Sequence, residues 1–179
     1  MGTAGGLGAL WYYLTVTGKL ALDTGWARRV QPLGPYSIDV AAPADTVFDV
    51  IALPYLARTP RAMAEHLRVL DRGTDLVLAE HYTKVHGGRL TAVTVETVTF
   101  QRPHRVGFRL VRGPVPHVTE EFTLTEQQGA TQLSYSGEIG ADFGLVGQWW
   151  ASRVGAAWEA AVRHSFASIQ AEAERRARA

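Results

Sequence analysis

The sequence predicts an α+β domain in which one long C-terminal helix covers a curved antiparallel sheet. Residues 142–178 form a long amphipathic run without proline, which is typical of a helix that buries one face. Most of the chain before this run reads as short segments of alternating polarity separated by turn residues, and such segments predict strands. A sheet that curls around a helix leaves room for a ligand, so the layout also indicates a pocket.

The composition is that of one globular domain. The chain has 179 residues, of which 46% are hydrophobic, and this is enough for a real core. Its 18 basic and 17 acidic residues give a formal charge of +1, so we expect no nucleic-acid partner. Cysteine is absent, which excludes disulfides, thiolate catalysis and cysteine metal sites.

Residues 1–35 are predicted to be an N-terminal apolar segment followed by a connector. The apolar part, Leu7–Val16, is shorter than the about 20 residues of a spanning helix. Its aromatic residues, Trp11 to Tyr13, would suit a membrane interface, and would equally suit docking on the domain or on a second subunit. No basic start or cleavage site of a secretory signal is visible. We therefore expect a cytoplasmic protein, with peripheral membrane contact through Leu7–Val16 as one alternative.

Residues 36–172 are predicted to form the folded domain. Tyr36, Ile38 and Val40 alternate with polar residues, as in a half-buried strand. The connections between later segments are mostly of hairpin length, so the sheet should be antiparallel. The seven predicted strands span residues 36–41, 66–71, 75–85, 89–101, 105–112, 117–125 and 131–139.

Two short helices are expected after the first strand. Pro43 suits a helix start because its φ is preset and it lacks an amide proton that would have no partner there. Val47 and Ile51 then share one helical face. Pro54 is expected to end this helix, and residues 55–65 to form the second one.

The last helix is expected to begin at Asp142, whose side chain is a good N-cap, and to end in a solvated charged tail, residues 173–179. Its predicted sheet-facing stripe follows three- and four-residue steps. The stripe consists of Phe143, Val146, Trp150, Val154, Ala157, Ala161, Ser165 and Ile169.

Three segments before the last helix resemble the SRPBCC superfamily of START-like domains, and in particular its polyketide cyclase/dehydrase branch. They are YSIDVAAPADTVFDVI at residues 36–51, VTFQRPHRVGFRLV at residues 98–111 and EEFTLTEQQGATQLSYSGEI at residues 120–139. The resemblance covers residues 36–172 and leaves the first 35 residues outside. It implies the helix-grip fold (START/Bet v 1-like), with a seven-stranded curved sheet, two short helices and a long C-terminal helix that encloses a mainly apolar cavity.

Three functions are compatible with this resemblance. The leading hypothesis is binding or transport of a hydrophobic small molecule: a lipid, isoprenoid, quinone or polyketide-like compound. The first alternative is a cofactor-independent enzyme of the polyketide cyclase/dehydratase type. The second is a partner-docking module with a collapsed cavity. No cofactor is expected, and the catalytic residues and the oligomeric state stay open.

Alternation on the strands indicates which side chains face the cavity. Phe108, Glu120, Phe122 and Tyr135 fall on the predicted inward faces. A carboxyl group facing an apolar cavity would have a raised pKa and could act as an acid or base. The alternative for Glu120 is a place near the strand end, in contact with water or Arg112. Tyr135 could equally be a core residue.

Trp150, Val154 and Trp158 are the candidate ligand contacts on the last helix. Trp150 and Trp158 lie about two turns apart on nearly the same helical face. The two indoles could wall the cavity and present flat apolar surface to a ring or acyl chain. The alternative is that they only pack the helix on the sheet.

The two central strands do not reveal their inward face, because both faces of residues 75–85 are partly apolar. Glu96 has the same ambiguity, so no general base is named from these strands. Neither an HxH nor an HExxH pattern occurs among the histidines, so no metal site is expected. No nucleophile elbow, P-loop or dinucleotide fingerprint is present either.

Overall fold

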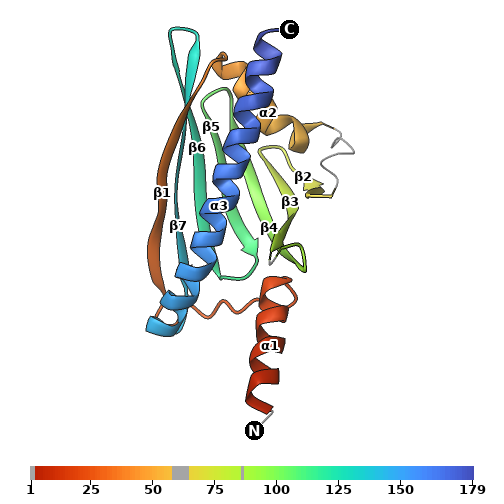
Figure 1. Ribbon diagram of the computed structural model, residues 1–179, viewed down its shortest axis with the longest axis vertical. Helices are drawn as coiled ribbons and strands as arrows, with labels where there is room; N and C mark the ends of the chain where they lie inside the picture. Colours follow the sequence, from red (N-terminus) through yellow and green to blue (C-terminus); the bar gives the residue numbers. More distant parts are fainter. Residues whose placement is uncertain (1–2, 58–64, 86) are drawn as a thin grey trace.

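The computed structural model describes residues 3–57, 65–85 and 87–179. Within these residues, a long helix lies across one antiparallel sheet, and a second helix packs near its C-terminal half (Figure 1). The elements are α1 (Thr3–Val16), β1 (Arg29–Val40), α2 (Ala44–Leu56), β2 (Leu67–Arg72), β3 (Leu76–Val85), β4 (Leu90–Gln101), β5 (Arg105–Arg112), β6 (His117–Gln127), β7 (Ala130–Ala141) and α3 (Gly144–Ala177).

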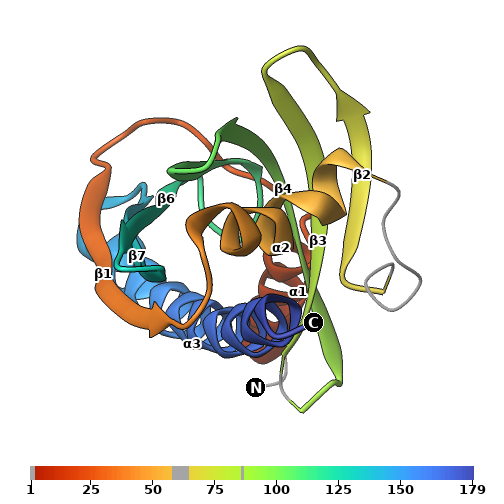
Figure 2. The same ribbon diagram turned by 90° about the horizontal axis from the view of Figure 1, so that it is seen from above.

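The sheet confirms the predicted fold class. Its seven strands are arranged in the order β1-β7-β6-β5-β4-β3-β2, and each pair of neighbours is antiparallel. Figure 2 shows the sheet curling around α3, which lies across the open side of the curve together with α2. Side chains from both layers fill the space between them and form the hydrophobic core.

The first strand begins earlier than predicted, at Arg29 instead of Tyr36. Its first half pairs with β7 from Arg29 opposite Ala141 to Leu33 opposite Gly137, and the register then shifts before Tyr36. The prolines in this segment indicated a break. They are tolerated because β1 lies at the edge of the sheet, where one side of the strand needs no ladder donors.

The prediction that Pro54 ends the first short helix is wrong. Pro54 lies inside α2, which continues to Leu56. The amide of Ala57 donates to the carbonyl of Leu53, so helical hydrogen bonding passes the proline. Of the second short helix, expected at residues 55–65, the first two residues belong to α2, and residues 58–64 lie outside the described part of the chain.

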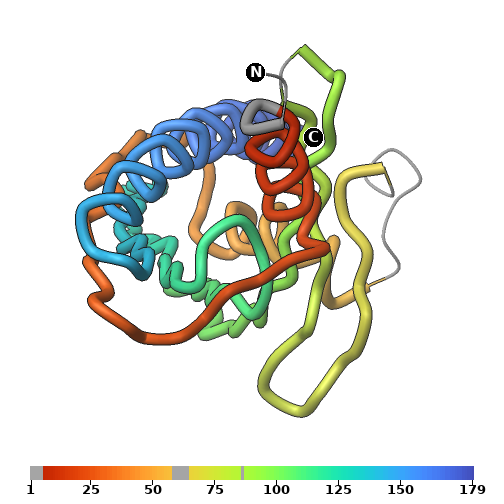
Figure 3. The backbone as a smooth tube through the Cα atoms, turned by 90° about the horizontal axis from the view of Figure 1, so that it is seen from below, coloured from red at the N-terminus to blue at the C-terminus, as the bar shows by residue number. Residues whose placement is uncertain are grey.

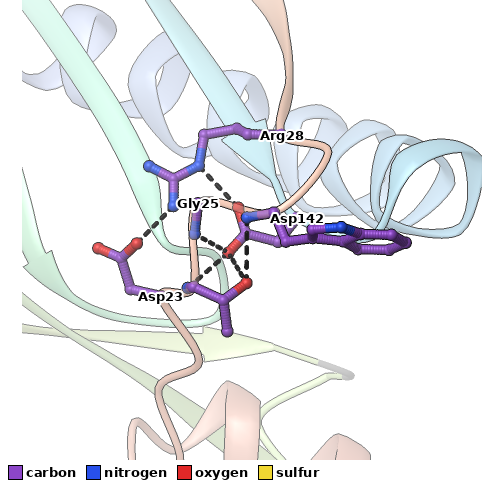
Figure 4. Close-up of polar contacts among 6 residues, drawn as sticks. Asp23, Gly25, Arg28 and Asp142 are labelled. Carbon is purple, nitrogen blue, oxygen red and sulfur yellow. Dashed lines mark hydrogen bonds and ion pairs between the residues drawn. The ribbon is translucent and has the colours of Figure 1, made fainter.

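The N-cap predicted at Asp142 is also wrong. Phe143 occupies the N-cap position with a left-handed φ of 72°. The buried carboxylate of Asp142 instead accepts hydrogen bonds from the amides of Thr24 and Gly25 at 2.7 and 2.9 Å, and from Nε of Arg28 at 2.7 Å (Figure 4). Donors on the connector outcompete the helix end, because they surround the carboxylate with charge-assisted hydrogen bonds.

The buried face of α3 differs from the predicted stripe. Phe143, Val146, Ala157 and Ser165 are exposed, whereas Trp150, Val154 and Ile169 are partly buried against the core as expected. Small residues allow the helix to approach β1 and β7 closely. A prediction that looks for large apolar side chains at three- and four-residue steps does not recognise glycine and alanine as buried positions. The fully buried positions are Gly147, Ala151, Gly155, Val162, Phe166 and Ala173.

Helix α1 stands outside the sheet–helix body and projects from one end of it (Figure 1). Seen from below, it lies at the edge of the ring formed by the sheet and α3 (Figure 3). Its C-terminal half makes the contact: the rings of Trp11 and Tyr12 meet Trp150 edge-on, with centroids 5.6 and 5.8 Å apart. In the described part of the chain, no helix combines the length and apolarity needed to cross a membrane.

Candidate ligand-binding site

Glu120 lies at the centre of a polar group between α3 and the sheet. Its Oε2 accepts a hydrogen bond from the Tyr135 hydroxyl at 2.9 Å and another from Nε1 of Trp158 at 2.7 Å. The three side chains come from β6, β7 and α3. The sheet and the covering helix therefore meet at this carboxyl group.

A glycine makes this position of Glu120 possible. Gly137 of β7 is the register partner of Glu120. A Cβ atom at position 137 would lie 2.6 Å from the carbonyl oxygen of Thr119 and 2.8 Å from Cβ of Glu120. Only glycine fits without displacing the strand that carries the carboxyl group.

Burial raises the pKa of Glu120 to about 8, and the negative charge of Glu96 adds to this effect. The hydrogen bonds from Trp158 and Tyr135 act in the opposite direction, because they stabilise the carboxylate. Glu120 is therefore mostly protonated near neutral pH. No described residue bonds to its Oε1, so this oxygen is free to bond a ligand.

An aromatic cluster adjoins the carboxyl group through Tyr135. The Phe122 ring has its centroid 5.2 Å from Phe108, 5.2 Å from Phe166 and 5.9 Å from Tyr135. These rings come from β5, β6, β7 and α3, and all four are buried. They pack against one another in edge-on and tilted arrangements, the geometries that aromatic pairs prefer.

A second polar chain lies on the β3–β4 side of the concave face. The Tyr55 hydroxyl and His81 Nε2 are 3.0 Å apart, and His81 Nδ1 is 3.4 Å from Oε2 of Glu96. Thr94 donates to the other oxygen of Glu96 at 2.7 Å. His81 Nδ1 is buried and has no hydrogen-bond partner among the described residues, so the imidazole is bonded to Tyr55 and lies near Glu96 without a hydrogen bond to it.

Burial shifts the pKa values of Glu96 and His81 in this second polar group. It raises the pKa of Glu96 to about 7, against a smaller lowering by the Thr94 hydrogen bond, and lowers the pKa of His81 to about 4. Burial also raises the pKa of Tyr55 well above its usual range. Near neutral pH the histidine is therefore neutral, and a carboxyl group with a pKa of about 7 is present in both its protonated and its ionised form.

The structure brings together five of the seven predicted ligand contacts: Phe108, Glu120, Phe122, Tyr135 and Trp158. Val154 packs against the core on the same helix. Trp150 does not join this group, because its Nε1 donates to the Pro114 carbonyl at 2.7 Å and its ring meets α1. The alternative in which Glu120 contacts Arg112 is wrong, since Arg112 pairs with Glu80 at 3.6 Å.

Four residues of this region were not predicted: Tyr55, His81, Glu96 and Phe166. The strand pairing brings His81 opposite Thr94, and Glu96 opposite the buried Ala79. Val77 and Ala79 lie on the same face of residues 75–85 as His81, and they could have indicated that this face is the inward one. The larger Leu76 and Leu78 made the opposite face look equally apolar, although Leu76 is exposed.

Two hollows are described, and Glu120 lines neither of them. A groove of about 980 Å³ runs beside β2 and β3, where Leu67, Val69 and Tyr82 belong to its lining. A void of about 10 Å³ between β1, β7 and α3 is too small for a ligand. Glu120, Val154 and Trp158 keep partial exposure, but neither of these two hollows is the enclosed apolar cavity expected between α3 and the sheet. Among the described residues, no group of three or more acidic or histidine side chains could hold a metal ion.

Residues 35–174 match the family described as polyketide cyclase/dehydrase and lipid transport. Such a family supports either binding of a hydrophobic small molecule or chemistry of the polyketide cyclase type. No curated protein matches the chain.

Solved structures with similar folds come from bacteria and a plant. The Zhui aromatase/cyclase from Streptomyces sp. R1128 is 17% identical, with a TM-score of 0.64 over 83% of this chain and 95% of that chain. The protein TTHA0849 from Thermus thermophilus is 12% identical, with a TM-score of 0.62 over 80% and 97%. Norcoclaurine synthase from Thalictrum flavum, in complex with dopamine and hydroxybenzaldehyde, is 15% identical, with a TM-score of 0.51 over 64% and 72%. At these identities the likeness shows the fold alone.

Proposed function

Because the chain belongs to the polyketide cyclase/dehydrase and lipid transport family, we propose that it binds a hydrophobic small molecule between α3 and the concave face of the sheet. One observation carries the proposal. Tyr135 and Trp158 both donate to Oε2 of Glu120, and this leaves the proton of the neutral carboxyl group on Oε1. A donor with no partner among the described residues, beside an aromatic cluster, suits a ligand with an oxygen acceptor.

The chemistry of the site favours an oxygen-bearing ligand over a plain hydrocarbon. Burying an unpaired carboxyl group against hydrocarbon is costly, whereas a carbonyl oxygen accepts the hydrogen bond and removes this cost. The rings of Phe108 and Phe122 would supply apolar contact on either side. Polyketide-like compounds, quinones and oxygenated isoprenoids meet both conditions.

A matched pair of probes tests this proposal. 2-Acetylnaphthalene carries a carbonyl group, and 2-ethylnaphthalene has nearly the same shape without it. We expect the protein to bind the ketone about five-fold more tightly below neutral pH, as one neutral hydrogen bond predicts. This preference should decline as the pH rises through about 8, where Glu120 ionises. Fluorescence titration measures both affinities.

Two variants of Glu120 serve as controls. Glu120→Gln keeps a donor that does not titrate, so the preference for the ketone should persist at all pH values. Glu120→Leu removes the donor, so the two probes should bind equally. Equal binding of both probes by the unaltered protein would count against an oxygen anchor, and no binding of either would favour the collapsed partner-docking module.

A second candidate function is supported by the group of three polar side chains Tyr55, His81 and Glu96. A carboxyl group with a pKa of about 7 next to a neutral histidine can remove and return a proton near neutral pH. We propose that, in an enzyme of the cyclase or dehydratase type, Glu96 would act as the base that removes a proton from carbon next to a ligand carbonyl. Thr94 would orient this base through its hydrogen bond, and the neutral His81, held by Tyr55, would lie beside it.

Hydrogen exchange on the ketone probe tests the second candidate. In D₂O, removal of a methyl proton from 2-acetylnaphthalene and return of a deuteron replaces hydrogen with deuterium, which proton NMR detects. The protein should accelerate this exchange, and Glu96→Gln should abolish the acceleration while probe binding persists. If the exchange rate is the same with and without protein, the binding function stands alone.

Peripheral membrane contact through Leu7–Val16 is also a proposal. Support comes from Leu7, Leu10, Trp11 and Tyr13, all of which are exposed on α1. This helix has no charged side chain. Apolar side chains that project from the body in this way suit the interfacial region of a bilayer.

A further inference from the structure

The first turns of α3 expose apolar side chains that the fold does not need. Leu145, Val146 and Trp149 are 71%, 73% and 59% exposed, although the solvent face of an amphipathic helix is normally polar. Farther along the same helix, the exposed positions include Arg163 and His164. The large apolar side chains that α3 exposes therefore lie at its N-terminal end.

The connector extends this apolar surface. Trp26 is 67% exposed, and its ring lies 6.1 Å from that of Phe143. Two backbone hydrogen bonds of 3.0 Å, Phe143 to Trp26 and Gly144 to Ala27, hold the segments together. We call Trp26, Phe143, Leu145, Val146 and Trp149 the α3 corner.

The bonds of Asp142 fasten the α3 corner to the body. Its buried carboxylate binds the connector through Thr24, Gly25 and Arg28 (Figure 4). The exposed rings on either side are thus held in place by a fixed support. A preformed apolar surface pays little ordering cost when it docks.

The α3 corner lies at the same end of the molecule as α1. Figure 1 shows the start of α3 and the whole of α1 at this end, joined by the connector. The contact of Trp11 and Tyr12 with Trp150 ties the two elements together. A planar partner that receives α1 would therefore also meet the α3 corner.

Basic side chains border this end. Lys19, Arg29 and Arg153 are exposed, and the Arg153 guanidinium lies 5.3 Å from the ring centroid of Trp149. Two acidic groups lie nearby, Asp23 and the buried Asp142, and both pair with Arg28. This arginine offsets one of their two negative charges, so one negative charge remains against the three positive charges of the exposed basic side chains. The border thus carries local positive charge in a chain with a formal charge of only +1.

We infer that the α3 corner, together with α1, docks on the surface of an anionic lipid bilayer. Indole and aliphatic side chains suit the interfacial region, and lysine and arginine suit anionic headgroups. A helix of 14 residues is about 21 Å long, less than the about 30 Å of the hydrocarbon layer, so α1 would enter one leaflet. A two-fold dimer through this face is disfavoured, because it would bring the basic borders of both copies together.

Docking in this orientation would place one end of the interface between α3 and the sheet at the bilayer. Trp150 lies there, between the Pro114 carbonyl and α1. A hydrophobic ligand, if the protein binds one as proposed above, would then enter from the membrane without crossing water. The docking itself does not depend on the ligand, so the two can be tested separately.

Flotation of the full chain with lipid vesicles tests the inference. We expect binding to vesicles of mixed phosphatidylcholine and phosphatidylserine, and weaker binding to phosphatidylcholine alone. Leu145→Ser/Val146→Ser should reduce binding about ten-fold or more, because two apolar side chains lose their burial in lipid. The matched control, Leu70→Ser/Leu76→Ser, alters two exposed apolar residues of β2 and β3 and should bind normally. Thermal melting verifies that both variants fold.

Two results would overturn the inference. If Leu7→Ser/Leu10→Ser abolishes vesicle binding while Leu145→Ser/Val146→Ser leaves it intact, α1 alone contacts the membrane. If no vesicle binds and ultracentrifugation shows a dimer that Leu145→Ser/Val146→Ser dissociates, the occupant is a second copy.

Reversal of charge in Arg29→Glu/Arg153→Glu should remove the preference for phosphatidylserine, and an unchanged preference would contradict the role of the basic border.

Discussion

Trp158 of α3 donates a hydrogen bond to Glu120 of β6, with Nε1 and Oε2 2.7 Å apart. This bond joins the terminal helix to the sheet at an ionisable group. The stability of the layers, the ionisation of Glu120 and the binding of a ligand should therefore depend on one another, and this coupling can be measured.

The first prediction concerns stability and pH. The raised pKa of Glu120, about 8, means that the folded state holds this proton more tightly than the unfolded chain does. Its contribution to stability is therefore greatest in acid and declines as the pH rises from about 4.5 to about 8. The melting temperature of Glu120→Gln should decline less over this range. An equally steep decline in both proteins would contradict the raised pKa.

The second prediction concerns Trp158. The indole donor stabilises the carboxylate and so lowers the pKa of Glu120. Trp158→Phe keeps an aromatic ring but removes the donor, so the pKa of Glu120 should rise further. Carbon-13 NMR of labelled glutamate carboxyl groups measures this change. Trp149→Phe is the control, because Trp149 is exposed on the same helix and should leave the titration unchanged.

The third prediction concerns the connector. Asp142→Ala removes a buried carboxylate that binds Arg28 and two backbone amides, and should lower the free energy of unfolding by about 3 kcal/mol. Asp23→Ala removes the exposed partner of the same arginine and should cost less than about 1 kcal/mol. Urea unfolding measures both values. Equal losses would show that Asp142 is no special anchor.

The Arg28 guanidinium, through its hydrogen bond, also holds the pKa of Asp142 well below its usual range. A lowered carboxyl pKa contributes stability above the unfolded value of 3.8, and this contribution is lost as the pH falls further. Acid should therefore reduce the difference in stability between the unaltered protein and Asp142→Ala.

The fourth prediction concerns Gly137. A Cβ atom there would press on Thr119 and Glu120, so Gly137→Ala should destabilise the protein by about 1–3 kcal/mol through overpacking. Displacement of Glu120 should also weaken binding of 2-acetylnaphthalene more than that of 2-ethylnaphthalene. Ser136→Ala, at an exposed neighbouring position, should change neither stability nor binding. Normal stability of Gly137→Ala would mean that the strands separate easily here.

Much of the fold could be predicted from local patterns. The strands at residues 105–112 and 117–125 were placed correctly, because one face of each is buried and polarity therefore alternates. Phe108, Phe122 and Tyr135 follow from the same alternation. The errors at Pro54 and in the proline-rich start of β1 have one cause, because local rules treat proline as a break in a helix or strand. In the structure, α2 continues beyond Pro54. At the start of β1 proline is tolerated because an edge strand does not need every backbone donor of the ladder.

The site could be predicted only in part. Glu120 was identified because it alternates in phase with the inward-facing residues of its strand. Its partners come from β7 and α3, and strand alternation cannot show which helical side chain reaches it. His81 and Glu96 were missed because β3 and β4 are apolar on both faces, so alternation does not distinguish the inward face. The role of Asp142 was wrong, since a capping rule considers only the following helix and not a connector more than a hundred residues earlier.

The sequence by itself determined the class of the fold, the antiparallel order of short strands and the presence of a terminal amphipathic helix, because these depend on periodicity and turns within a few residues. The tertiary structure alone decided that Glu120 would be held by Tyr135 and Trp158, that Tyr55 would bond to His81 near Glu96, and that α1 and the α3 corner would share one end. These depend on strand register and on how the helix is rotated against the sheet, and both are set by packing between residues far apart in the chain.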